Sequence, residues 1–520
     1  MPEIIIKAIK KLIKTPTKSQ KSLNLKTMKI KLLSLITLAL FIASCGGDAK
    51  KETKATHKYE YETVEGDALN TFIYTLDNGL KVYMSVNKDE PRIQTNIAVN
   101  TGSKQDPSDA TGLAHYLEHM VFKGTSKMAT INWEEEKVLL TQISDLYEKR
   151  RTVTDEAERK AIYQQIDSVS GEAAKYAVAN EYDKMISSIG AKGTNAYTSV
   201  EQTVYINDIP SNEIEKWLAI ESERFQELVL RLFHTELEAV YEEYNRGKDN
   251  DYRLTYSTMN ENLFKKHTYG TQSTIGTSEH LKNPSMEKIH QYFSERYVAN
   301  NMAIVLSGDL DPDNTVDLIK KYFGDYKRKE VPTFTPAVED EITEPVYVTV
   351  KGSDAEWVNI GYRLPGVKSE DIFMLNLFDG LLNNGQAGLI DLDLIKGQKV
   401  LDAYSSPNTM KDYSVFQLSG NPREGQSLEE VKDLLLAQIE KIKAGEFEEW
   451  MLPAVIKDFK LSEQQRNQYN SARAGKMTDA FIMGEDWETV VNTNDKLSKV
   501  SKTDIIAFAN KYFNDNYVVV

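Results

Sequence analysis

The chain has 520 residues, of which 41% are hydrophobic and 27% charged, and its formal net charge at pH 7 is −15. This length exceeds what one hydrophobic core usually organises, and the composition is that of a globular protein, which excludes long-range disorder and a multi-span membrane protein. The excess of acidic residues repels phosphate groups, so we expect no nucleic-acid partner.

The first 44 residues have the layout of an export signal rather than of a folded domain. A basic start at Met28 leads into an apolar run over 32–42, and the segment ends in Ala-Ser-Cys45, which resembles a bacterial lipobox. Cys45 is the only cysteine, so no internal disulfide can form. We predict residues 1–44 as an upstream extension plus lipoprotein signal peptide, Cys45 as the lipidated residue and 45–63 as a tether. The alternative is a short N-terminal anchor helix with a chance cysteine.

The next 270 residues alternate between strand and helix patterns. Strands are predicted over 72–76, 80–86 and 93–99, because apolar residues alternate there and Asp77-Asn78-Gly79 is a hairpin turn signal. Apolar residues three or four apart predict a helix over 110–122. A charged segment, 133–188, is predicted as an inserted helical hairpin with a break and N-cap at 152–155. Further predictions are β structure over 192–207, helices over 211–246 and 287–297, and a buried strand over 302–308.

A similar plan restarts after a linker rich in proline and charge, residues 327–345. Strands are predicted over 346–350, 358–364 and 415–420, with helices over 369–382, 428–443, 448–483 and 502–512. The fold class is therefore α+β, with two similar domains over 64–330 and 340–520. Each is expected to be an antiparallel-rich sheet covered by helices.

The chemistry of the chain is concentrated in a His-x-x-Glu-His pattern formed by His115, Glu118 and His119. Residues four apart lie on one face of a helix, so the two imidazoles can bind one metal ion. Glu118 lies beside them, where a carboxylate can take a proton from a water that zinc has acidified. This is the inverzincin pattern of metalloproteases, and two histidines on an ordinary amphipathic helix are the alternative.

A catalytic zinc site usually has three protein ligands, so a further carboxylate is needed. Glu236 and Glu243 are seven residues apart and share one helical face. The pattern alone makes them equal candidates, whereas Glu242 points elsewhere.

Several blocks in order resemble the pitrilysin family, which includes insulin-degrading enzyme and the mitochondrial processing peptidase. The blocks are LDNGLKVYMS, the signature-like stretch over 102–125, GTNAYTS (193–199), ELEAVYEE (236–243), and two blocks within 267–311. The resemblance implies a zinc-dependent endopeptidase or oligopeptidase with one Zn²⁺ in the first domain and a non-catalytic second domain. It implies His115, His119 and Glu243 as zinc ligands and Glu118 as general base.

The same resemblance assigns supporting roles. Glu236 corresponds to a carboxylate that orients the site. Asn195 and Ala196 fall on an edge strand to which family members add an extended substrate, although Asn195 is alternatively a turn or capping residue.

Family active sites lie in a chamber between two halves, and this chain corresponds to one half. We therefore expect unfolded or short peptides as substrates and a second half, on another chain or in a longer protein, as partner. The lipid anchor would hold the protein to a membrane on the periplasmic or cell-surface side of a bacterium. The competing functions are a non-catalytic assembly or binding subunit and a metal-binding surface lipoprotein.

Overall fold

The computed structural model describes residues 57–520, so Cys45, the predicted signal peptide and most of the tether lie outside the described residues. Residues 59–520 form one compact unit. No helix in this described part is long and apolar enough to cross a membrane.

The first half contains a six-stranded sheet in the order β1-β2-β6-β3-β5-β4, with β4 at one edge. All neighbouring strands are antiparallel except β2 and β6, which are parallel. The central strand β6 is buried along its whole length because both faces of the sheet are covered. The strands are β1 (Thr71–Thr75), β2 (Lys81–Val86), β3 (Arg92–Val99), β4 (Lys192–Thr198), β5 (Thr203–Pro210) and β6 (Met302–Gly308).

Most helices of this half pack in one core with one face of that sheet. The predicted helix over 110–122 is α3 with the short turn η2. The helices are η1 (Ser103–Gln105), α3 (Leu113–Met120), η2 (Val121–Lys123), α4 (Trp133–Thr152), α5 (Glu156–Ala173), α6 (Glu181–Ser188), η3 (Ser211–Glu213), α7 (Ile214–Gln226), α8 (Phe233–Lys248), α9 (Asp251–Leu263), α10 (Thr268–Thr271), α11 (Ser278–Lys282), α12 (Met286–Arg296), η4 (Ala299–Asn301) and α13 (Pro312–Phe323).

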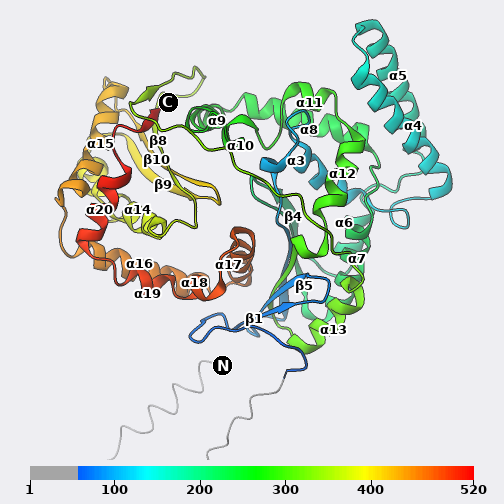
Figure 1. Ribbon diagram of the computed structural model, residues 1–520, viewed down its shortest axis with the longest axis horizontal. Helices are drawn as coiled ribbons and strands as arrows, with labels where there is room; N and C mark the ends of the chain where they lie inside the picture. Colours follow the sequence, from blue (N-terminus) through cyan, green and yellow to red (C-terminus); the bar gives the residue numbers. More distant parts are fainter. Residues whose placement is uncertain (1–56) are drawn as a thin grey trace, which may run out of the picture. The chain divides into compact units, whose positions relative to one another are not determined.

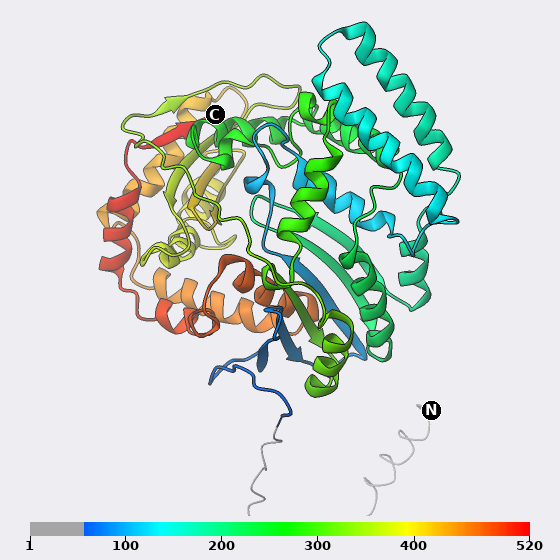
Figure 2. The same cartoon turned by 45° about the vertical axis from the view of Figure 1, so that its right-hand side comes forward.

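The predicted hairpin is formed by α4 and α5, which project from the sheet as an antiparallel pair (Figures 1 and 2). Asp155 caps α5 by accepting a hydrogen bond from the backbone N–H of Glu158. The hairpin ends at Ala173, and α6 is a separate helix that packs beside α7. The predicted range 133–188 was therefore too long for a two-helix hairpin.

The second half contains a five-stranded sheet in the order β7-β11-β8-β10-β9. Its helices cover one face in a separate core. The strands are β7 (Val346–Tyr347), β8 (Val358–Pro365), β9 (Asp402–Thr409), β10 (Tyr413–Asn421) and β11 (Tyr517–Val519); the helices are η5 (Ile372–Met374), α14 (Leu375–Leu382), the π-helical turn η6 (Asp391–Lys396), α15 (Leu428–Ala444), α16 (Met451–Arg466), α17 (Asn470–Met483), α18 (Trp487–Val491), α19 (Thr493–Leu497) and α20 (Lys502–Tyr512). The predicted α+β class with two similar antiparallel-rich sheets is confirmed.

Each half contributes one helix that packs on the sheet of the other half. From the second half, α17 packs on β3 and β6 and places Ala474 and Met477 against the second face of the first sheet. From the first half, α9 packs on β8 and β11, with Met259 and Leu263 in a shared cluster. Each sheet therefore buries its second face against a helix from the other half.

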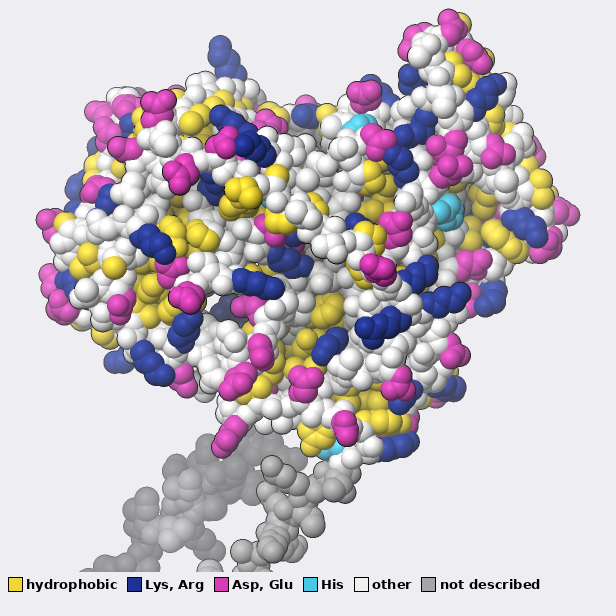
Figure 3. All heavy atoms as spheres, viewed as in Figure 1, with side chains coloured by type: hydrophobic (Ala, Val, Ile, Leu, Met, Phe, Trp, Pro, Cys, Tyr) yellow, Lys and Arg dark blue, Asp and Glu magenta, His cyan; other side chains and the backbone are white. Residues whose placement is uncertain are grey.

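Three predicted elements were wrong in detail. The helix predicted over 448–483 is two helices, α16, which ends at Arg466, and α17, which begins at Asn470. The continuous helix over 211–246 is broken, because the chain turns sharply between the end of α7 and the start of α8, where Leu232 has a φ of 56°. The strand over 346–350 is reduced to Val346–Tyr347. Acidic and basic side chains are interspersed over the face shown in Figure 3.

Candidate metal centre

The start of α3 is fixed by a buried carboxylate. Asp106 accepts hydrogen bonds from the backbone N–H groups of Gly112, Leu113 and Ala114, at 2.8, 3.2 and 3.0 Å. These are N–H groups that a helix leaves without an internal partner, so the carboxyl group of Asp106 satisfies the first turn. Burial raises the pKa of Asp106 to about 8, although the three N–H hydrogen bonds oppose the rise. Gly112 has a φ of 84°, and a Cβ there would lie 2.4 Å from the carbonyl oxygen of Ile275. The histidine pair therefore begins one residue beyond a tightly specified helix start.

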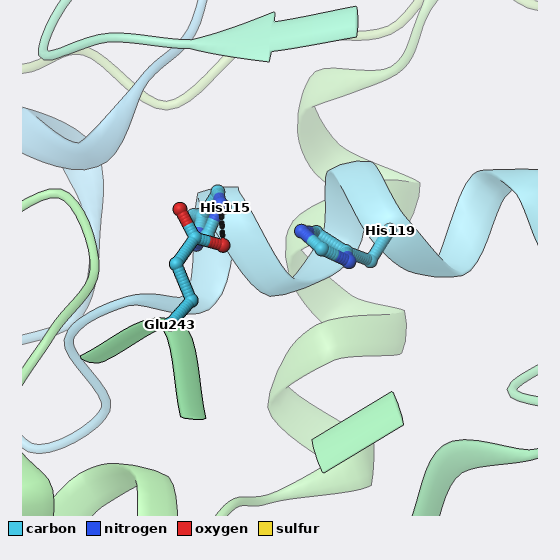
Figure 4. A group of neighbouring side chains, drawn as sticks. All are labelled: His115, His119 and Glu243. Carbon is cyan, nitrogen blue, oxygen red and sulfur yellow. Dashed lines mark ion pairs between the residues drawn. The ribbon is translucent and has the colours of Figure 1, made fainter. Parts of the chain in front are cut away.

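His115 and His119 lie one turn apart on α3, and Glu243 reaches them from α8 (Figure 4). One ligand atom from each residue lies within 4.8 Å of the others. The Nε2 of His115 is 3.7 Å from a carboxylate oxygen of Glu243. Among residues 57–520 this is the only group of three or more His, Cys, Asp or Glu side chains close enough to share one ion.

The orientation of His119 is set by Glu236, which lies two turns before Glu243 on α8. The Nδ1 of His119 and a carboxylate oxygen of Glu236 are 2.9 Å apart, and Lys123 makes an ion pair with the other oxygen at 2.5 Å. Burial alone would raise the pKa of Glu236, but the hydrogen bonds from His119 and Lys123 outweigh it, and the pKa lies below its ordinary value. An ionised Glu236 accepts a hydrogen bond from Nδ1–H of His119 and leaves Nε2 for a metal.

The side chain of His115 is held in its neutral form. Burial, together with the nearby His119, lowers the pKa of His115 to about 4. Its Nδ1 is buried and has no hydrogen-bond partner among the described residues. A neutral imidazole is the form that binds a metal ion.

Glu118 lies on the same helix but is turned toward the sheet. Its side chain is 8% exposed, and one carboxylate oxygen accepts a hydrogen bond of 2.6 Å from the hydroxyl of Thr198 on β4. Burial raises the pKa of Glu118 above its ordinary value, although the hydrogen bond from Thr198 and the proximity of His119 oppose the rise. A carboxylate whose pKa is raised is a better proton acceptor than an ordinary surface Glu.

The donor set fits zinc. Two imidazoles and one carboxylate form a common ligand set of catalytic zinc sites, which keep one position open for water or substrate. The geometry brings together His115, His119 and Glu243, with Glu236 behind His119 and Glu118 beside them. The two carboxylates that the sequence left equal also differ in their contacts. Glu236 hydrogen-bonds to His119, whereas an oxygen of Glu243 lies within 4.8 Å of a nitrogen of each imidazole.

Asn195 and Ala196 lie on β4, the edge strand nearest to α3. Ala196 packs against the core that contains α3, and Asn195 is exposed. The sequence analysis missed Thr198 and Asp106. Asp106 lies six residues before Gly112, the N-cap of α3, so it is outside the position at which sequence patterns identify a capping residue. No sequence pattern identifies the contact that Thr198 makes across the fold.

The chain matches known family models over more than half of its length. Residues 81–140 and 169–277 match the family model described as Insulinase (Peptidase family M16), and 285–458 match the one described as Peptidase M16 inactive domain. The zinc protease PqqE of Helicobacter pylori is 23% identical over 450 residues, which span 85% of this chain and 90% of the relative.

Solved structures share the fold. A protease from Helicobacter pylori has a TM-score of 0.71 and 22% identity, covering 86% of this chain and 98% of its own. The periplasmic protease PqqL from Escherichia coli has a TM-score of 0.66 and 17% identity, and the match covers 87% of this chain but 47% of PqqL. The two family models, the zinc-protease relatives and the shared fold together establish that this chain belongs to peptidase family M16, the pitrilysin family of zinc metallopeptidases.

Proposed function

We propose that this protein is a zinc-dependent peptidase that hydrolyses peptide bonds in unfolded or short peptides. The observation that carries the proposal is the convergence of His115, His119 and Glu243 beside a buried carboxylate, Glu118, next to the free edge of a sheet. The domain over 64–330 would hold this site, with one Zn²⁺, and the domain over 340–520 would be non-catalytic.

In this proposal His115, His119 and Glu243 hold the ion, and Glu236 fixes the ring of His119. A bound zinc ion supplies a Lewis acid that acidifies water and polarises a carbonyl group. Glu118 is the general base. Its Oε2 is held by Thr198, so Oε1, which has no hydrogen bond from the described residues, takes the proton of the attacking water and returns it to the leaving amine.

The substrate would add to β4 as an extended strand. One side of this edge strand pairs with β5, and its other side is free of strand partners within the described residues. Backbone pairing at Asn195 and Ala196 would place a peptide alongside α3 without reading its sequence closely. Such pairing needs an extended chain, which supports unfolded or short peptides as substrates.

The cellular setting and partner are also proposals. Lipidation at Cys45 would anchor the protein to a membrane, and the similarity to a protease described as periplasmic supports the periplasmic or cell-surface side. The chain corresponds to about half of PqqL, which supports a second half, on another chain or in a longer protein, that closes the chamber. A non-catalytic subunit would not need Glu118, so its presence beside the three ligands favours catalysis.

The test uses the purified full chain, a mixture of quenched fluorescent peptides and measured zinc content. Glu118→Gln should bind as much zinc as the wild type and cleave at least about a hundredfold more slowly. Glu242→Gln is the matched control, because Glu242 is an exposed carboxylate on the same helix as Glu243. Absence of zinc from the wild type, or equal cleavage by wild type and Glu118→Gln, would overturn the proposal.

A further inference from the structure

The strand proposed to receive the substrate also touches the proposed base. The Oγ1 of Thr198, the last residue of β4, donates a hydrogen bond of 2.6 Å to Oε2 of Glu118 on α3. Among the described residues this is the only hydrogen bond that the carboxylate of Glu118 receives. The second oxygen, Oε1, is therefore available to accept a proton, and the direction in which it points depends on the hydrogen bond from Thr198.

The position of Thr198 is itself well fixed. It pairs with Thr203 across the β4–β5 hairpin, and the turn that follows is closed by a hydrogen bond of 2.8 Å from the N–H of Ser199 to the carbonyl of Gln202. The turn is also joined to the loop before α3. The N–H of Lys104 donates to the carbonyl of Val200 at 3.1 Å.

A buried ion pair reinforces that junction. The Nζ of Lys104 lies 2.8 Å from a carboxylate oxygen of Glu201, and both side chains are almost completely buried. The hydroxyl of Thr198 therefore belongs to a corner of the sheet that is held by backbone hydrogen bonds and a buried ion pair.

We propose that Thr198 is a positioning residue that aims the carboxylate of Glu118 at the peptide paired with β4. The inference rests on the proposed function and extends it by one residue. The same strand would hold the substrate backbone through its main chain and the base through its side chain. The distance between base and scissile carbonyl would thus be set within one element. Misplacing a catalytic group by about 1 Å can cost about a hundredfold in rate.

Two substitutions at Thr198 distinguish the contribution of the hydroxyl from that of the side-chain shape. Thr198→Val keeps the branched shape and the strand preference but removes the donor, whereas Thr198→Ser keeps the donor and removes a methyl group. Thr95→Val is the matched control. Thr95 lies on β3 in the same sheet, away from the edge proposed to receive the substrate, and its hydroxyl donates to the carbonyl of Asn207 at 3.0 Å.

In Thr198→Val we expect kcat to fall about ten- to a hundredfold, with KM within about twofold of the wild type and zinc content unchanged. Thr198→Ser should retain most of kcat, and Thr95→Val should match the wild type within about twofold. The inference is overturned if kcat of Thr198→Val stays within twofold, if Thr198→Ser is as slow as Thr198→Val, or if only KM changes.

A second measurement does not depend on turnover. Crystal structures of the wild type, Thr198→Val and Thr198→Ser should show the carboxylate of Glu118 displaced only in the Val variant. A carboxylate that superimposes in all three overturns the inference. If the wild type binds zinc but cleaves no peptide, the proposed function fails, and these structures still decide whether Thr198 positions Glu118.

Discussion

Arg231 links the two segments that carry the proposed metal ligands. It is 1% exposed and lies just before α8, and its Nε and Nη2 donate to the two carboxylate oxygens of Glu136 at 2.6 and 2.8 Å. Its remaining N–H groups donate to the carbonyls of Lys123, Thr125 and Met128, in the segment that follows α3. All five donors of the guanidinium are therefore satisfied, and Glu136 is contributed by the hairpin helix α4.

We predict that Glu136→Gln destabilises the protein by about 3 to 5 kcal/mol, because it leaves a buried guanidinium without its counter-charge. A buried ion pair can often be replaced by two apolar side chains without loss. Here the double variant Glu136→Leu, Arg231→Met should remain at least about 2 kcal/mol less stable than the wild type. It leaves the carbonyls of Lys123 and Thr125 buried without their donors, at about 1 to 3 kcal/mol each, whereas Met128 keeps a bond from the N–H of Thr125.

The assay is urea unfolding of the metal-free protein, followed by circular dichroism, with each free energy taken from the midpoint and slope. Glu172→Gln is the control, because Glu172 pairs with Lys175 at 2.6 Å at the exposed end of the same hairpin. Its effect should stay below about 1 kcal/mol. A loss below about 1 kcal/mol in Glu136→Gln would refute the reasoning. Full recovery in the double variant would show that the carbonyl contacts of Arg231 contribute nothing.

Three further predictions concern the metal and the junction between the halves. Glu236→Gln should weaken zinc binding about 10- to 100-fold, because it weakens the hydrogen bond that orients His119. The affinity is measured by competition with a chromophoric chelator, and an unchanged affinity would contradict the role of Glu236 in orienting His119. Zinc at about 100 times its Kd should stabilise the wild type by about 2.7 kcal/mol in thermal unfolding, and a Glu243→Ala variant that gains as much would contradict the ligand assignment. Burial alone would raise the pKa of Asp412, but hydrogen bonds from His267 and Lys104 outweigh it and lower the pKa to about 2. The ionised carboxylate therefore stabilises the folded protein by about 2 kcal/mol at pH values above the unfolded pKa, and this stabilisation is lost as the pH falls toward 2. The stability difference between wild type and Asp412→Asn should therefore narrow by about 1 kcal/mol from about pH 5 to about pH 3 in urea unfolding, and a constant difference would refute the assignment.

The metal centre could be found from the sequence because its information is local. His115 and His119 share a helical face by spacing alone, and the resemblance to the family then selected Glu243 over Glu236. In the structure Glu236 contacts His119 and Lys123, which supports Glu243 as the proposed third ligand.

The remaining differences between prediction and structure arise from tertiary contacts. The stretch between α7 and α8 contains no glycine or proline, and it breaks where Arg231 turns inward to its buried partners. Strand β9 is polar, partly exposed and contains Pro407, all of which suit an edge strand. It therefore lacks the alternating apolar residues from which strands are predicted. Helix α13 had a readable start, Asp311 followed by Pro312, and was overlooked.

The packing of α9 on the second sheet and of α17 on the first sheet explains how the second half supports a candidate site that lies in the first half. Helix α9 follows directly after α8, which carries Glu243, and its apolar residues Met259 and Leu263 are buried only because the second sheet covers them. In return, Met477 of α17 covers the face of the first sheet opposite α3. Neither sheet buries both faces without the other half, so the position of Glu243 depends on packing that the second half supplies. The second half therefore covers the helix that follows the one carrying Glu243, independently of any part it takes in catalysis.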